Sequence, residues 1–97
     1  MSITIADHVF EGPYTSTKEL MNDPGVFAVI VANGDKGALI DVGESSNVGE
    51  CVENHPDKSR WHQFSTEGKL CFAVLYIPAS SPSERHTIEQ QIRSQYS

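Results

Sequence analysis

Basic residues are scarce in this sequence. The chain has 97 residues, of which seven are lysine or arginine and thirteen are aspartate or glutamate, for a formal net charge of −6 at pH 7. The imbalance is local, because residues 1–57 carry a net charge of −8 and residues 58–97 carry +2. Nucleic-acid binding requires lysine and arginine to neutralise phosphates, so the composition disfavours a nucleic-acid partner without excluding one. We expect a protein or small-molecule partner instead.

Cysteines and long apolar runs are also scarce. The two cysteines, Cys51 and Cys71, are too few for a disulfide framework and are expected to be reduced thiols. The longest apolar runs, at residues 26–32 and 71–77, are too short to span a bilayer. The first residues show neither the basic start nor the apolar stretch of a signal peptide. We therefore expect one domain over residues 1–97, a cytoplasmic location and no membrane segment.

The apolar residues fall into short runs that predict secondary structure. Residues 1–14 are expected to form an extended arm that is broken at Gly12-Pro13. Strands are predicted at residues 26–32, 38–42 and 69–77, and helices at 47–54 and 82–95, with a short helix capped by Thr15 or Ser16 and a helical turn at 58–64. A tight turn at residues 33–37 joins the first two strands, since Asn-Gly tolerates positive φ. This order predicts an α+β fold with a three-stranded, mostly antiparallel sheet flanked by helices.

Asp41 interrupts the second predicted strand. A charge rarely interrupts an apolar strand unless a partner compensates it. We expect Asp41 either to accept hydrogen bonds from the amides at the start of the next helix or to pair with an arginine such as Arg60 or Arg85. A second interpretation is that Asp41 and Glu89 hold a cation together.

Cys51 and His55 lie four residues apart on the predicted helix at 47–54 and therefore share a face. This spacing allows a cysteine nucleophile activated by a histidine. A packed thiol beside a surface histidine is the simpler interpretation, because the sequence offers no third residue to orient the pair.

Several motifs together resemble the GIY-YIG nuclease family. Gly25-Val26-Phe27, then a hairpin and Asp41-Val42-Gly43, match the register of the two tripeptides that name the family. The segment Gly43–Val48 is similar to the family's helix start, and Ile88-Glu89 lies in a late helix like the one that carries the family's metal-binding glutamate. The resemblance covers residues 24–95 and implies a GIY-YIG-like fold.

The chain also resembles a subgroup of small uncharacterised bacterial proteins. The residues that carry this second resemblance are Asp41–Ser45, Asn47-Val48, Asn54-His55 and Arg60-Trp61. The subgroup makes Asp41 a regular feature of the strand and brings no established activity. His55 also stands where many GIY-YIG nucleases carry a histidine.

GIY-YIG nucleases hydrolyse a phosphodiester with two tyrosines, an arginine and a glutamate that holds one divalent cation. At the corresponding positions this sequence has Phe27 for the first tyrosine, Asp41 for the second and Cys51 for the arginine. Only Glu89 remains, and the resemblance implies that it is the ligand of Mg²⁺ or Mn²⁺. Because Phe27 has no hydroxyl and Cys51 no guanidinium, the resemblance implies that most of the catalysis is lost.

Two hypotheses follow from these substitutions. In the first, the GIY-YIG-like domain is catalytically inactive and acts as a binding or regulatory module for an unknown protein or small-molecule ligand. In the second, it is a divergent DNA endonuclease that uses Asp41 and His55 as catalytic residues and Glu89 as the ligand of Mg²⁺ or Mn²⁺. An exposed sheet edge would also allow a homodimer.

Overall fold

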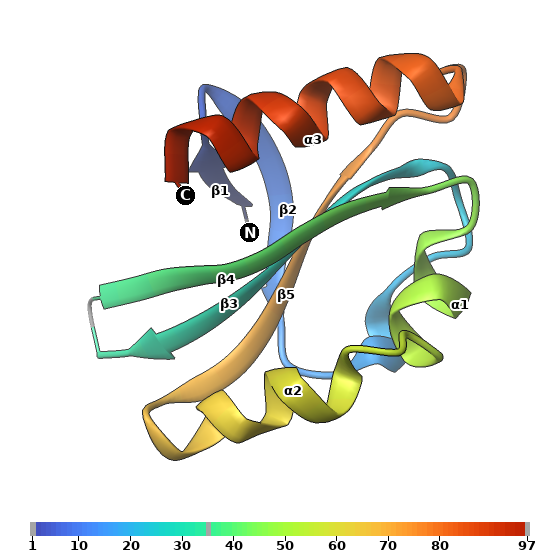
Figure 1. Ribbon diagram of the computed structural model, residues 1–97. Helices are drawn as coiled ribbons and strands as arrows, with labels where there is room; N and C mark the ends of the chain where they lie inside the picture. The colour runs from blue at the N-terminus through green and yellow to red at the C-terminus, as the bar shows by residue number, and fades with distance from the viewer. Residues whose placement is uncertain (1, 35, 97) are drawn as a thin grey trace.

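A single antiparallel sheet forms the centre of the structure (Figure 1). The computed structural model describes residues 2–34 and 36–96. The five strands are β1 (Ser2–Ile5), β2 (His8–Tyr14), β3 (Gly25–Asn33), β4 (Lys36–Ser45) and β5 (Lys69–Tyr76). They lie in the order β1-β2-β5-β3-β4, so β3 and β5 are central and β4 is an edge strand.

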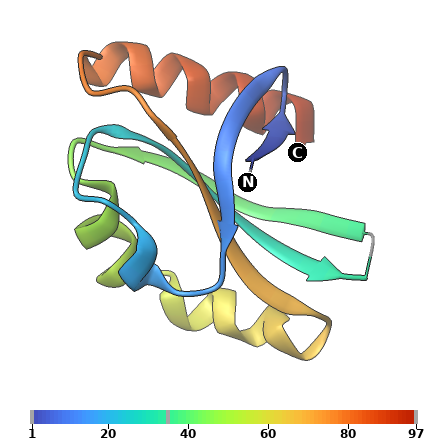
Figure 2. The same cartoon turned by 180° about the vertical axis from the view of Figure 1, so that it is seen from behind.

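The helices form a layer on each face of this sheet (Figure 1, Figure 2). The long helix α3 (Pro82–Tyr96) covers one face, and the short helices α1 (Val48–Glu53) and α2 (Lys58–Gln63) cover the other. Two 3₁₀ turns, η1 (Thr17–Glu19) and η2 (Phe64–Thr66), complete the second layer. The α+β class predicted from the sequence is confirmed. Within the two described ranges, no helix is long and apolar enough to cross a membrane.

The central strand β3 is buried over residues 25–31, as its continuous apolar run predicts for a strand covered on both faces. Its side chains alternate between two cores. The core under α3 contains Ile5, Phe10, Val26, Ala28, Ile30, Val42, Ala73 and Ile92. The core under α1 and α2 contains Leu20, Phe27, Val29, Val48, Val52, Trp61, Phe72 and Val74. The predicted strands at 26–32, 38–42 and 69–77 and the late helix are all present.

The N-terminal segment differs from the prediction of an extended arm. It forms the hairpin β1–β2, and β2 pairs with β5, so the sheet has five strands and not three. The turn is built from Ala6 and Asp7, both with positive φ, and contains no glycine that would signal it. Gly12-Pro13 does not end the strand, because the β2–β5 register shifts between Glu11 and Tyr14, and such an irregularity accommodates proline within a sheet.

The predicted tight turn between β3 and β4 begins at Asn33 and Gly34, and Gly34 has the positive φ of 63° that such a turn requires. Asp35, which the sequence also places in this turn, lies outside the described residues. The turn joins two long strands whose pairing runs from Gly25 opposite Ser45 to Asn33 opposite Lys36.

Candidate functional site

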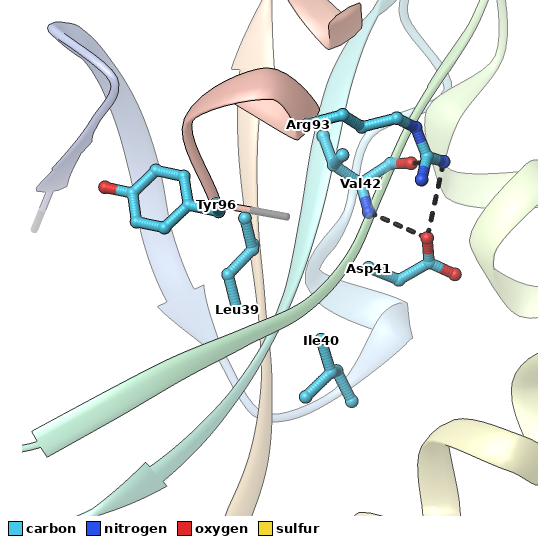
Figure 3. Close-up of a pocket in the computed structure, with 6 residues that line it drawn as sticks. All are labelled: Leu39, Ile40, Asp41, Val42, Arg93 and Tyr96. Carbon is cyan, nitrogen blue, oxygen red and sulfur yellow. Dashed lines mark hydrogen bonds and ion pairs between the residues drawn. The ribbon is translucent and has the colours of Figure 1, made fainter. Parts of the chain in front are cut away.

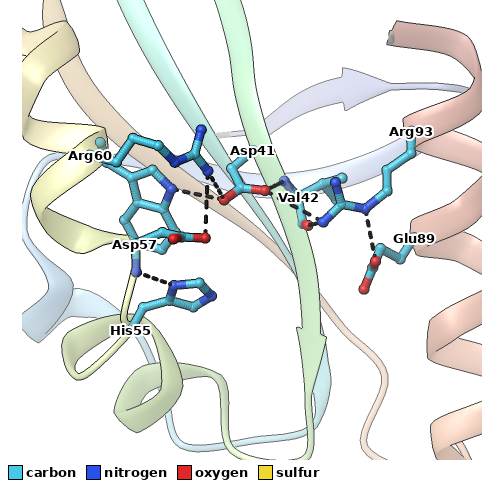
Figure 4. Close-up of polar contacts among 8 residues, drawn as sticks. Asp41, Val42, His55, Asp57, Arg60, Glu89 and Arg93 are labelled. Carbon is cyan, nitrogen blue, oxygen red and sulfur yellow. Dashed lines mark hydrogen bonds and ion pairs between the residues drawn. The ribbon is translucent and has the colours of Figure 1, made fainter.

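Asp41 lies on β4 at an irregularity of the sheet. Val29 is opposite Asp41, but the next residue, Ile30, is opposite Leu39, so Ile40 is an extra residue that forms a bulge. A bulge bends and twists an edge strand and changes the direction of the neighbouring side chain. The side chain of Asp41 is only 10% exposed and lies between the layer of α2 and the layer of α3 (Figure 4).

Both carboxylate oxygens of Asp41 accept hydrogen bonds. Oδ2 accepts from the indole Nε1–H of Trp61 at 2.9 Å and from Arg60 at 3.0 Å, and both donors belong to α2. Oδ1 accepts from the backbone N–H of Val42 at 2.9 Å and lies 3.5 Å from Nη2 of Arg93 on α3. The expectation that Asp41 pairs with Arg60 is confirmed. Asp41 therefore connects the helices on opposite faces of the sheet.

Arg93 extends this set of contacts to Glu89. Its Nε–H donates to Glu89 at 2.9 Å, one helical turn away, and its Nη2 donates to the carbonyl oxygen of Val42. The carboxylate of Glu89 is only 13% exposed. The spacing of Glu89 and Arg93 is visible in the sequence as an i,i+4 pair. The contact of Arg93 with Asp41 has no sequence signal, since it depends on how α3 crosses β4.

Arg85, the other arginine expected beside Asp41, pairs with Glu44 instead. Its side chain is 4% exposed, and its Nε–H donates to Glu44 at 2.9 Å. Its Nη1 donates to the backbone oxygen and the hydroxyl of Ser80. These contacts fix the first turns of α3 on β4, just as Arg93 fixes its last turns.

His55 packs in an aromatic cluster with Trp61 and Phe27. Its ring lies on Trp61 with 4.5 Å between ring centroids and meets Phe27 edge-on at 5.9 Å. Its Nδ1 accepts the backbone N–H of Asp57 at 3.1 Å, so this nitrogen is not available to the thiol of Cys51. Trp61 separates His55 from Asp41, because the indole contacts both residues.

The three candidate residues of the endonuclease hypothesis are thus connected but not adjacent (Figure 4). Arg93 stands between Glu89 and Asp41, and Trp61 stands between Asp41 and His55. Asp41 lines a hollow of about 150 Å³ with Leu39, Ile40, Val42, Arg93 and Tyr96 (Figure 3). His55 lines a different pocket of about 410 Å³, together with Ser45, Asn47, Glu50, Cys51, Asn54 and Pro56.

Phe27, at the family's first tyrosine position, is a core residue that is 1% exposed. Its ring covers Gly43, where an added Cβ would lie only 2.5 Å from the ring. The ring also meets Trp61 at 6.4 Å. The two tripeptide positions therefore pack against each other, and the contacts of Phe27 are aromatic and apolar.

The start of α1 is closed by the chain that precedes β3. The backbone N–H groups of Val48 and Gly49 donate to the carbonyl oxygens of Asp23 and Met21. The N–H of Glu50 donates to the side-chain oxygen of Asn22 at 2.8 Å. Free amides at a helix start are what binds a phosphate. Here residues 21–23 occupy these amides.

The side chains at the implied cation site do not fit a divalent ion as they stand. Within residues 2–34 and 36–96, no group of three or more histidine, cysteine, aspartate or glutamate side chains is arranged to hold a metal. Glu89 is paired with Arg93, and Asp41 is paired with Arg93 and Arg60. A cation placed between these carboxylates would have to displace guanidinium groups and would be repelled by them.

The two cysteines differ in accessibility, which predicts their reactivity. Cys71 on β5 is 4% exposed, and burial raises the pKa of its thiol, while nearby Lys69 lowers it by less. Cys51 is half-buried and lines the pocket beside His55. We expect iodoacetamide to modify Cys51 in the folded protein and Cys71 only after unfolding, because the thiolate is the reactive form and a raised pKa leaves less of it at any given pH.

Mass spectrometry of the labelled peptides measures the two rates across neutral and alkaline pH. A Cys71→Ser variant should lose none of the fast labelling. Equal rates at both cysteines in the folded protein would contradict the packing of β5.

Comparison of this chain with known protein families, with curated proteins and with solved structures finds no match, so the resemblance to GIY-YIG nucleases rests on the motifs alone.

Proposed function

We propose that this chain is a GIY-YIG-like domain that does not cleave DNA and acts as a binding or regulatory module. The observation that carries the proposal is that Asp41 and Glu89, the two candidate acidic residues, are both engaged by other side chains. Asp41 accepts hydrogen bonds from Trp61 and Arg60 and is also paired with Arg93. Glu89 is paired with Arg93 as well.

The endonuclease scheme that the resemblance implies requires a carboxylate that is open to a cation or to a water molecule. Asp41 instead connects α2 and α3 at the edge of the sheet, and Glu89 pairs with Arg93 within α3, so both carboxylates have a structural role. His55 is committed to the packing of Trp61 and to the turn at Asp57. Neither carboxylate can take up a catalytic role without breaking contacts that stabilise the fold.

The ligand we propose is a protein segment or a small molecule. A net charge of −6 disfavours a nucleic acid, because each phosphate contact requires a basic side chain. The proposal includes a cytoplasmic location, which suits two free thiols.

A nuclease assay tests the proposal. The purified protein is incubated with plasmid and with single-stranded DNA in the presence of Mg²⁺ or Mn²⁺, beside Glu89→Gln. Glu84→Gln is the matched control, since Glu84 lies on the same helix but is exposed, and its carboxylate accepts hydrogen bonds from Ser81. We expect all three proteins to leave the DNA intact. Metal-dependent cleavage that Glu89→Gln abolishes and Glu84→Gln retains would overturn the proposal and favour the endonuclease that uses Asp41, His55 and Glu89.

A further inference from the structure

β4 is an edge strand whose outward backbone groups are occupied near Val42, whereas residues 37–40 are open to another strand. At Val42 both backbone groups are taken by side chains, because Asp41 accepts the N–H and Arg93 donates to the carbonyl oxygen. Such capping of an edge strand prevents other chains from pairing with it. Residues 37–40, by contrast, carry no charge and no proline, and Gly37 and Ala38 are exposed.

The register shows which backbone groups of this open stretch face outward. The N–H and C=O groups of Val42 bond to the side chains of Asp41 and Arg93, so they point away from β3, and by the alternation of an antiparallel pair the backbone groups of Asp41 point toward Val29. The backbone groups of Val31 point the same way as those of Val29, so the backbone groups of its partner Ala38 also point toward β3. The N–H and C=O groups of Gly37 and Leu39, on either side of Ala38, therefore point away from the sheet and can bond to an additional strand.

A hollow of about 430 Å³ lies on the α2 side of this open edge. Its lining residues are Val31, Asn33, Gly37, Ala38, Ile40, Phe64 and Glu67. The hollow stays open because the side chain of Ala38 is too small to fill the space between β4 and η2. An added strand would place alternate side chains on this face, so one large apolar side chain of that strand would enter the hollow.

Charge decides between the occupants of such an edge. A second copy of this chain would bring another net charge of −6 to a chain that already carries −6. Glu67 brings a carboxylate to the rim of the hollow, and its backbone oxygen accepts the side-chain amide of Asn33. A basic segment is complementary to the carboxylate of Glu67 and to the net charge of the chain.

We propose that residues 37–40 of β4 bind an extended segment of a partner protein by strand addition. The segment inserts one large apolar side chain between Ala38 and Phe64 and carries lysine or arginine at the flanking positions. This inference rests on the proposed function as a binding module and specifies its partner. Main-chain hydrogen bonds to the outward-facing groups provide affinity, and the hollow and Glu67 provide specificity.

A titration followed by amide NMR spectra of the isotope-labelled protein tests this surface. The probe is a short synthetic peptide of alternating lysine and valine with phenylalanine at its centre, compared with the same peptide in which glutamate replaces each lysine. We expect the basic peptide to shift the amide signals of residues 37–40 and to slow their hydrogen exchange. The acidic peptide should bind at least about tenfold more weakly.

Two variants make the test specific. Ala38→Phe fills the hollow from the protein's own side at an exposed position and should weaken binding of the basic peptide at least about tenfold. Val9→Phe makes a similar enlargement on β2, where Val9 is 59% exposed, and should leave binding unchanged. The proposal is wrong if neither peptide shifts residues 37–40, if Ala38→Phe binds as the wild type does, or if these signals move with protein concentration alone, which would identify a second copy as the occupant. Each of these outcomes is separate from DNA cleavage, which tests the proposed function itself.

Discussion

Replacing Asp41 with alanine is expected to lower the free energy of unfolding by about 3 kcal/mol, a large part of the stability of a small domain. Trp61 is fully buried, and the substitution leaves its indole N–H without an acceptor. The same change removes the acceptor of the Val42 N–H and one of the two carboxylates that each of Arg60 and Arg93 contacts. A buried donor that loses its partner costs its whole desolvation free energy, which is why the expected loss exceeds that of one surface ion pair.

Asp41→Asn separates the two contributions. The amide oxygen can still accept from Trp61, but the amide NH2 takes the place of the oxygen that accepts from Val42, and the ion pairs with Arg60 and Arg93 are lost. Because these arginines are 49% and 46% exposed, solvent screens the pairs, and we expect a total loss of about 2 kcal/mol, smaller than that of Asp41→Ala.

Urea denaturation followed by tryptophan fluorescence measures both variants. Asp57→Asn is the matched control, because Asp57 pairs with Arg60 at 3.5 Å but is 48% exposed, and its loss should stay within about 0.5 kcal/mol. A cost of the same size for Asp41→Ala would show that the carboxylate does not hold the helices.

The pair of Arg85 and Glu44 should respond asymmetrically to substitution. Glu44→Ala leaves the guanidinium of Arg85, which is 4% exposed, without its counter-ion, and we expect this to cost about 3 kcal/mol. Arg85→Met removes the buried charge and keeps an apolar chain of similar length, whereas Glu44 remains 25% exposed to solvent. We expect this second variant to cost only about 1 kcal/mol.

The double variant makes the asymmetry measurable. Adding Arg85→Met to Glu44→Ala should raise the free energy of unfolding, because the unpaired buried charge is removed. Arg60→Met is the control for the loss of an arginine that is half exposed, and it should cost less than about 1 kcal/mol. A double variant that is less stable than Glu44→Ala alone would show that Arg85 stabilises α3 through packing and its bonds to Ser80 more than through Glu44.

The central strands and the late helix were predictable from local patterns. The continuous apolar run at residues 26–32 predicts a strand covered on both faces, and β3 is that strand. Pro82 at the first turn predicts the start of α3. The hairpin β1–β2 was missed because its turn residues, Ala6 and Asp7, adopt positive φ without glycine. Pro13 also lies inside β2, where local rules place a break.

The polar contacts were predictable only in part. A charge in an apolar strand requires a partner, so the need of Asp41 for an arginine follows from the sequence. Arg60 of α2 was one of the expected partners, whereas the contact with Arg93 depends on how α3 crosses β4. Arg85 and Arg93 are two helical turns apart, a distance of about 12 Å along α3. This distance is close to the spacing of about 10 Å between Glu44 and Asp41 along β4. The helix antiparallel to β4 therefore brings Arg85 to Glu44 and Arg93 to Asp41, a match that no local pattern reveals.

The most direct test of the central claim is the free energy of unfolding of the wild type and of Asp41→Asn, each measured with and without excess Mg²⁺. If Asp41 holds the two helical layers together, Asp41→Asn is less stable than the wild type, and Mg²⁺ changes neither protein. A carboxylate kept for catalysis gives the opposite result, because active-site charges are held at a cost to stability and a bound cation stabilises the folded state. An Asp41→Asn protein that is as stable as the wild type or more so, together with a wild type that Mg²⁺ stabilises, would contradict the structural role of Asp41.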